Sequence, residues 1–197
     1  IRPALQVLSV RPGLKKVSGL YVLITGKGEI YFLADTTVNI EPTAEDLAEI
    51  AICTAEMARR FDVEPRVAML SFSNFGSTRH PLAEKVRRAA EIVHQLEPGL
   101  MVDGEMQADT AVAPEIIEET YPFCRVKGGA NVLIFPNLEA GNIAYKLLMR
   151  IGGCEAIGPI LMGLSKPVHV LQRGCEVNDI VNMAAIAVVD AQQSESR

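Results

Sequence analysis

The sequence has no apolar run long enough to cross a membrane, since none of its hydrophobic stretches reaches the roughly 18 residues that a spanning helix needs. It also has no recognisable signal peptide, and it begins at Ile1 rather than at a methionine. Such a start suggests a processed or truncated piece of a longer protein. No contact with a membrane is expected, and the cytoplasm is the expected location.

An excess of basic residues is missing as well. The chain holds 19 Lys and Arg against 24 Asp and Glu, which gives a formal net charge of -5. A protein that binds nucleic acids through the phosphate backbone needs a basic surface. This charge balance therefore argues against a nucleic-acid partner.

Paired cysteines and metal-binding clusters are also absent. The four cysteines form no C-x-x-C pair, have no histidine at zinc spacing, and lie at Cys53, Cys124, Cys154 and Cys175. The three histidines stand apart from one another and from the cysteines. We therefore expect reduced, mostly buried thiols and no metal site in this chain.

The motifs that bind nucleotides or carry a catalytic serine are likewise missing. The chain has no P-loop, no G-x-S-x-G elbow and no G-x-G-x-x-G fingerprint. What it does contain is typical of a folded globular protein, with 49% hydrophobic and 22% charged residues in a chain of 197. That length fits one large domain or a domain and a half.

Strand-like and helix-like patterns alternate along the chain. Apolar runs predict strands over residues 4–10, 19–25, 29–35, 66–72, 99–105, 131–136 and 167–172. Helical spacing predicts helices over residues 42–61, 81–97, 113–120, 139–151 and 177–192, with Thr43 capping the first. This alternation indicates an α/β fold, with a mostly parallel sheet flanked by helices and functional sites in the loops past the carboxyl ends of the strands.

Two strand-to-helix loops in the middle of the chain are candidate sites. The first holds Ser71, Ser73 and Asn74 before a helix N-terminus, where backbone N–H groups favour an anion; the alternative is a polar loop that caps its helix. The second holds three carboxylates, at Asp103, Glu105 and Asp109. These acids could do acid–base work or bind a metal, but helix caps and partners of nearby Arg or Lys are the favoured interpretation.

Two further loops are candidates in the C-terminal half. Asn142 and Lys146 could present an amide and an ammonium to a cleft, and Gly141 in the same helix indicates either close packing or a ligand near the backbone. In the segment "VLQRGCEVNDIVN", Arg173 offers a planar fork suited to phosphate. Asp179, about one turn into the last helix, is either a first-turn acid or a buried base.

Several segments resemble the phosphate acetyltransferase family. They read "RPALQ", "VSG", "NIEPTAEDLAEIA", "VDGEMQADTAVAPE", "ANVLIFPNLEAGNIAYK", "AIGPILMGLSKPV" and "RGCEVNDIVN". The resemblance implies acetyl transfer between acetyl phosphate and coenzyme A. It also implies an isocitrate-dehydrogenase-like fold of two α/β subdomains around a cleft, usually dimeric. By the same resemblance, residues 1–163 form the central subdomain, and residues 164–197 return to a first subdomain that is otherwise missing.

The resemblance also gives roles to individual residues. In the family the loop typically reads Ser-Arg-Gly-Cys with an aspartate further along, and Arg173, Gly174, Cys175 and Asp179 match that pattern. The serine position is Gln172, which places a longer amide where the family has a hydroxyl. If the chain is active, Arg173 and Asp179 are the expected catalytic pair. The expected ligand-binding residues are Ser71, Ser73, Asn74, Asn142, Lys146, Gln172, Arg173, Gly174 and Asp179.

The departure at Gln172 points to a regulatory relative of the family. The segments "LSFSNFGS" and "VNMAAIAVVDAQ" resemble the acetyltransferase-like C-terminal domain of bacterial NADP-dependent malic enzymes. The main expectation is therefore a non-catalytic module that binds acetyl-CoA and helps a malic enzyme to oligomerise. NADP and a divalent metal would belong to the missing portion, which decarboxylates malate to pyruvate. The alternatives are an active phosphate acetyltransferase and a module mainly for homo-oligomerisation, through a dimer of central subdomains.

Overall fold

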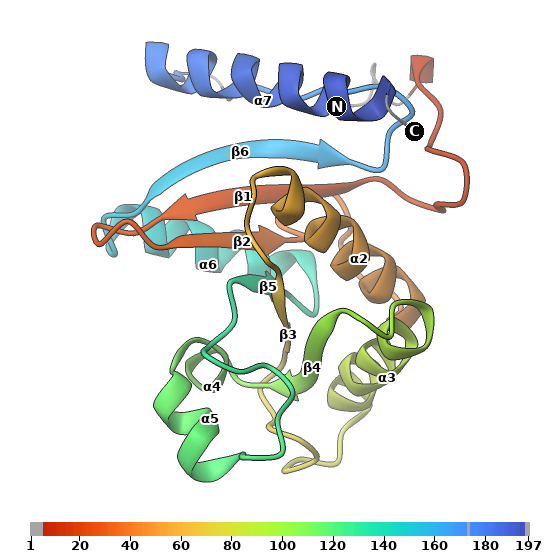
Figure 1. Ribbon diagram of the computed structural model, residues 1–197, viewed down its shortest axis with the longest axis vertical. Coiled ribbons are helices and arrows are strands. Elements are labelled where there is room, and N and C mark those ends of the chain that lie inside the picture. The colour runs from red at the N-terminus through yellow and green to blue at the C-terminus, as the bar shows by residue number, and fades with distance from the viewer. Residues whose placement is uncertain (1–5, 173, 196–197) are drawn as a thin grey trace.

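The computed structural model describes residues 6–172 and 174–195, which form one six-stranded sheet covered by helices on both faces (Figure 1). The strand order is β4-β3-β5-β2-β1-β6. The strands are β1 (Ser18–Ile24), β2 (Ile30–Ala34), β3 (Arg66–Leu70), β4 (Met101–Met106), β5 (Val132–Ile134) and β6 (Glu155–Met162). The helices are α2 (Ala44–Arg60), α3 (Pro81–Leu96), α4 (Ala108–Val112), α5 (Pro114–Thr120), α6 (Leu138–Arg150) and α7 (Val177–Glu195).

The sheet is mixed but mostly parallel. Strand β5 pairs in parallel with β2 and β3, and β3 pairs in parallel with β4. Strand β1 is antiparallel to both of its neighbours, β2 and β6. Because helical crossovers connect the parallel strands, the carboxyl ends of these strands meet at one edge of the sheet. The predicted α/β class, with helices flanking a mostly parallel sheet, is confirmed.

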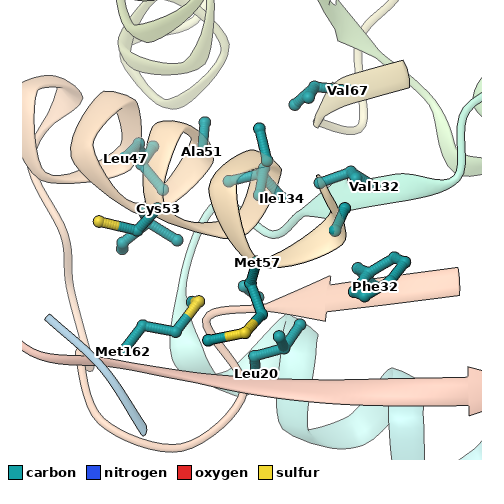
Figure 2. Packing of buried hydrophobic residues seen from close by; sticks show 14 of the residues in the cluster. Leu20, Phe32, Leu47, Ala51, Cys53, Met57, Val67, Val132, Ile134 and Met162 are labelled. Carbon is teal, nitrogen blue, oxygen red and sulfur yellow. The ribbon is translucent and has the colours of Figure 1, made fainter. Parts of the chain in front are cut away.

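The two faces of the sheet carry separate cores. On one face, α2, α3 and α7 bury a cluster that includes Leu20, Phe32 and Met162. In Figure 2, Met57 of α2 reaches toward Leu20 and Met162. The other face is covered by α4, α5 and α6. Each large apolar side chain buried in this way contributes about 1.5–3 kcal/mol, so the cores hold the two helical layers on the sheet.

Thr43 is the N-cap of helix α2, as predicted. The Thr43 side chain accepts a hydrogen bond from Asp46 N, and the Asp46 carboxylate accepts one from Thr43 N, which closes a capping box. Lys16 Nζ lies 2.6 Å from the same carboxylate. The helix start is therefore tied to the segment that precedes β1.

Two predicted strands are wrong and one real strand was missed. Residues 167–172 form a single bridge, between His169 and Ile160, because Pro159 beside that bridge has no N–H with which to continue a ladder. Residues 6–10 of the predicted strand 4–10 hold a helical turn and one bridge from Val10, while residues 1–5 lie outside the described part. The missed strand is β6, whose Gly158 and Pro159 interrupt the apolar pattern. Proline is tolerated there because β6 is an edge strand.

The C-terminal helix α7 packs against β6 and α2. The proposed division of the chain at residues 163 and 164 stays a prediction. In the described ranges, no helix is long and apolar enough to span a membrane. The cytoplasmic location likewise stays a prediction.

Candidate active site

The loop between β6 and α7 lines a cavity of about 520 Å³. Residues from β1, the end of α6, the start of β6 and the start of α7 form its walls. They are Tyr21, Met149, Arg150, Cys154, Glu155, Ala156, Ile157, Gly158, Leu171, Gln172, Gly174, Cys175, Glu176, Asn178, Asp179 and Met183. Gln172, Gly174 and Asp179, three of the residues expected to bind a ligand, thus lie in one cavity.

The start of α7 fixes the orientation of Asp179. Its Oδ2 accepts a hydrogen bond from Glu176 N at 2.8 Å, and this bond caps the first turn of α7. Just before it, Cys175 N donates to the carbonyl oxygen of Gln172 at 3.3 Å, which closes the loop on itself. Asp179 is therefore a first-turn acid, and it also lines the cavity.

Tyr21 forms the side of the cavity that belongs to the sheet. Its ring stacks on that of Tyr145 from α6, with centroids 4.1 Å apart and planes 14° from parallel. Gln172 Nε2 donates a hydrogen bond to the Tyr21 hydroxyl. Burial, together with the neighbouring Tyr145, raises the pKa of Tyr21 well above its usual range. The hydroxyl therefore stays protonated, and its oxygen accepts from Gln172.

The cavity wall combines apolar and ionisable groups. Met149, Ile157 and Met183 are apolar, whereas Arg150 and Glu155 supply charges of opposite sign. Such a lining suits an elongated ligand that has both an apolar stem and polar groups. In the described ranges, no group of three or more His, Cys, Asp or Glu side chains is arranged to hold a metal ion.

The loop with Ser71, Ser73 and Asn74 lies elsewhere, around the buried carboxylate of Glu105. Ser73 Oγ donates to Glu105 Oε1 at 3.0 Å, and Asn74 Oδ1 accepts from Gln107 N at 2.7 Å. Arg87 binds the same carboxylate through two nitrogens, each at 2.9 Å. Glu105 thus pairs with an arginine, as the favoured interpretation predicted for these acids.

Asn142 and Lys146 lie on α6, outside the lining of the cavity. Asn142 Nδ2 donates to the carbonyl oxygen of Thr36 at 3.2 Å, at the carboxyl end of β2. Lys146 Nζ lies 5.0 Å from the centre of the Tyr145 ring, which in turn stacks on Tyr21. Lys146 therefore approaches the tyrosine pair from outside.

The structure groups the expected site residues into three places: the cavity, helix α6, and the loop around Glu105. Arg173 lies outside the described residues. Tyr21 and Arg150, which also line the cavity, were not expected. No local pattern in the sequence points to Tyr21, because its partner Gln172 is 151 residues away along the chain.

Known proteins match this chain over nearly its whole length. The phosphate acetyltransferase of Bacillus subtilis is 49% identical over 191 residues, which are 97% of this chain and 59% of that protein. The phosphate acetyltransferase of Clostridium acetobutylicum is 47% identical, over 98% of this chain and 60% of that protein. The chain therefore spans about three fifths of the length of these relatives.

Solved structures agree with these matches. A phosphotransacetylase from Streptococcus pyogenes superposes with a TM-score of 0.91 at 45% identity, covering 100% of this chain and 59% of that one. The EutD phosphotransacetylase from Staphylococcus aureus gives a TM-score of 0.89 at 41% identity, covering 98% of this chain and 58% of that one.

These relatives overturn the malic-enzyme interpretation. The expectation of a regulatory acetyl-CoA-binding domain, with NADP and oxidoreductase chemistry in a parent chain, is wrong, because the close relatives are phosphate acetyltransferases. That expectation gave too much weight to Gln172, a single position whose longer side chain the structure accommodates against Tyr21. The model of the phosphate acetyl/butaryl transferase family matches residues 1–188, and the chain belongs to that family.

Proposed function

We propose that the protein of which this chain is part is a phosphate acetyltransferase that moves an acetyl group between acetyl phosphate and coenzyme A. The observation that carries the proposal is the 49% identity to a phosphate acetyltransferase over 97% of the chain. The cavity beneath the 172–179 loop is consistent with it. Its mixed lining suits the thiol-bearing arm of coenzyme A, which has an apolar stem with amide groups along it.

In the proposed reaction, Asp179 takes the proton of the coenzyme A thiol. The thiolate then attacks the carbonyl carbon of acetyl phosphate, so that the carbon–sulfur bond forms as the bond from carbon to the phosphate oxygen breaks. Asp179 suits this step because it lines the cavity and because the hydrogen bond from Glu176 N holds its carboxylate in place. By resemblance to the family loop, Arg173 neutralises the phosphate that leaves.

A coupled assay that follows acetyl-CoA formation from acetyl phosphate tests the proposal on the complete protein. Asp179→Asn should lower kcat by about a hundredfold or more, since general-base catalysis typically contributes that much. Glu91→Gln is the matched control, because Glu91 is an exposed acid that pairs with Arg88 on α3 and does not line the cavity. A folded wild type without turnover would refute the proposal. Equal losses in the two variants would remove Asp179 from its role.

The homodimer implied by the resemblance stays a separate prediction. Sedimentation velocity on the complete protein measures its mass directly. A single monomeric species at micromolar concentration would contradict the prediction without touching the proposed chemistry.

A further inference from the structure

Tyr21 and Gln172 connect the sheet to the loop that carries the proposed catalytic groups. Tyr21 lies in the middle of β1, between β2 and β6, and its side chain is almost completely buried. Gln172 lies in the loop after β6, and its amide nitrogen donates to the Tyr21 hydroxyl. A contact between a loop and a strand that is paired on both sides is well suited to fixing that loop, because the neighbouring strands hold the strand in place.

The Tyr21 ring is held on more than one side. Tyr145 stacks on it in a nearly parallel orientation, 4.1 Å away. On β6, a Cβ added at Gly158 would lie 2.7 Å from Tyr21 Cδ1, so the absence of a side chain at Gly158 makes the room that the ring occupies. The hydroxyl of Tyr21 is therefore presented to the loop from a fixed position.

Hydrogen bonds between residues that are close in sequence lead from Gln172 to Asp179. The Gln172 carbonyl accepts from Cys175 N at 3.3 Å, and Glu176 N donates to Asp179 Oδ2 at 2.8 Å. Each contact links neighbours in the loop, whereas the Gln172 side chain links the loop to the sheet. A displacement of Gln172 would therefore be passed along to the start of α7 and to Asp179.

We propose that Tyr21 is a positioning residue for the acetyl transfer, which holds Gln172 and residues 174–179 in place through the Gln172 amide. The inference rests on the proposed function for its catalytic consequence, but its structural part stands on the contacts alone. It gives Gln172 a role that a serine, with its shorter side chain, could not fill at the same backbone position. We call this hydrogen bond from the Gln172 side chain to the Tyr21 hydroxyl the tether.

The hydroxyl oxygen is the atom on which the proposal depends. Tyr21→Phe keeps the ring, its stack on Tyr145 and the space beside Gly158. It removes the hydroxyl, which is the acceptor for the Gln172 amide and which also interacts with the Tyr145 side chain. Without this acceptor, the amide of the exposed Gln172 loses its hydrogen bond to the sheet and gains freedom to move. Since a misplacement of about 1 Å at a reacting group can cost about a hundredfold in rate, a small shift of the loop is enough to be measured.

A double-mutant cycle with Tyr21→Phe and Gln172→Ala tests the tether by hydrogen–deuterium exchange. Each single variant should raise the exchange rate of amides 174–179 by about fivefold, as expected for the loss of one hydrogen bond. The double variant should exchange no faster than the singles, because both remove the same contact. Additive effects, or unchanged exchange in Tyr21→Phe, would overturn the tether.

Kinetics on the complete protein test the catalytic consequence. Tyr21→Phe should lower kcat by about tenfold or more and leave KM for coenzyme A within about twofold, since the loop still forms but its groups are displaced. Tyr31→Phe on the neighbouring strand is the matched control and should change neither value. A kcat in Tyr21→Phe equal to that of the wild type would overturn the positioning role. If the wild type shows no turnover while the exchange cycle holds, the proposed function fails and the tether stands.

Discussion

At the scale of single residues, buried carboxylates shape the loops at the carboxyl ends of the strands. Asp35, after β2, accepts hydrogen bonds from Gly19 N at 3.1 Å and from Thr37 N at 2.8 Å. Glu105, in β4, accepts from Gly76 N at 2.7 Å and binds Arg87 through two nitrogens. A carboxylate can satisfy several backbone N–H groups at once, which is why a single buried acid can fix an irregular loop.

Glu105→Gln should destabilise the protein by about 2 kcal/mol, the usual cost of losing hydrogen bonds to a charged group. Burial by itself raises the pKa of Glu105. The hydrogen bonds from Arg87, Gly76 N and Ser73 lower it by more than burial raises it, so that this pKa lies below its ordinary value. Glu105 therefore stabilises the fold above the carboxyl pKa of the unfolded chain, about 4.3, and this stabilisation is lost as the pH falls through the lower folded value. Urea unfolding at pH 7 and at pH 3.5 measures both effects.

Glu91→Gln provides the control for this prediction. Glu91 pairs with Arg88 on the surface of α3, where the two side chains are 52% and 54% exposed. An exposed pair of this kind contributes at most about 0.5 kcal/mol. If both variants lost the same stability, the Glu105 network would not hold the 71–80 loop in the way its contacts imply.

At the scale of whole elements, α6 lies against the end of β2 because Gly141 has no side chain. A Cβ at this position would lie 2.5 Å from the carbonyl oxygen of Asp35 and 3.3 Å from Phe135 Cβ. Gly141 is buried on the inner face of α6, one turn before Tyr145. Of the two explanations left open by the sequence, close packing therefore accounts for this glycine.

Gly141→Ala should destabilise the protein by about 2 kcal/mol, although alanine is the better helix former, because a methyl group there overpacks the contact between helix and strand. Thermal unfolding measures the effect. Gly99→Ala is the matched control, because a Cβ at Gly99 meets nothing within 4 Å. A Gly141→Ala variant as stable as the wild type would mean that α6 can move outward at little cost.

Periodicity predicted those elements whose apolar pattern is uninterrupted. The amphipathic helices α2 and α3 and the buried strands β3 and β5 were predicted close to their observed bounds. Strand β6 was missed because Gly158 and Pro159 break its pattern, and the five-residue helix α4 is too short to show a period. Local pattern also predicted a strand at residues 167–172, where pairing depends on the backbone N–H and C=O groups that are available along β6.

Among the residues of the candidate site, too, local sequence predicted some and missed others. Gln172, Gly174 and Asp179 could be selected from sequence because they are close together and follow a family pattern. Tyr21 could not, since alternation in β1 shows only that it faces one side of the sheet. The path of the chain after β6 decides which residue Tyr21 contacts there. A single sequence does not show that path, so it cannot predict the contact with Gln172.

At the scale of the whole molecule, charged groups join the C-terminal helix to the rest of the fold. Arg60 of α2 pairs with Asp190 of α7, and both side chains are largely buried. His169, before α7, lies with its Nε2 3.6 Å from the other oxygen of Asp190, and only 2% of its side chain is exposed. Leu161 N donates to His169 Nδ1 at 3.3 Å, so this ring nitrogen acts as an acceptor. The imidazole is therefore held in its neutral form between β6 and α7.

Acid should loosen this junction before it affects the sheet. Burial lowers the pKa of His169, and the nearby Asp190 opposes this only in part. In the unfolded chain the imidazole takes up a proton below about pH 6.5, whereas in the folded protein it resists protonation until a lower pH. Stability from the neutral ring is therefore complete above about pH 6.5 and is lost as the pH falls below that value, by no more than about 1.4 kcal/mol per pH unit.

Urea unfolding at pH 7.5 and pH 5.5 measures this loss, and His169→Gln, which cannot titrate, isolates it. The wild type should lose more stability than the variant between the two values, by no more than about 1.4 kcal/mol, because one proton per molecule is taken up below pH 6.5. Between pH 7.5 and 8.5 the two proteins should change alike, since the imidazole is neutral in both states there. Hydrogen–deuterium exchange of amides 180–192 should show that the loss falls on α7. Equal acid sensitivity in wild type and variant would mean that His169 does not set the pH dependence of this helix.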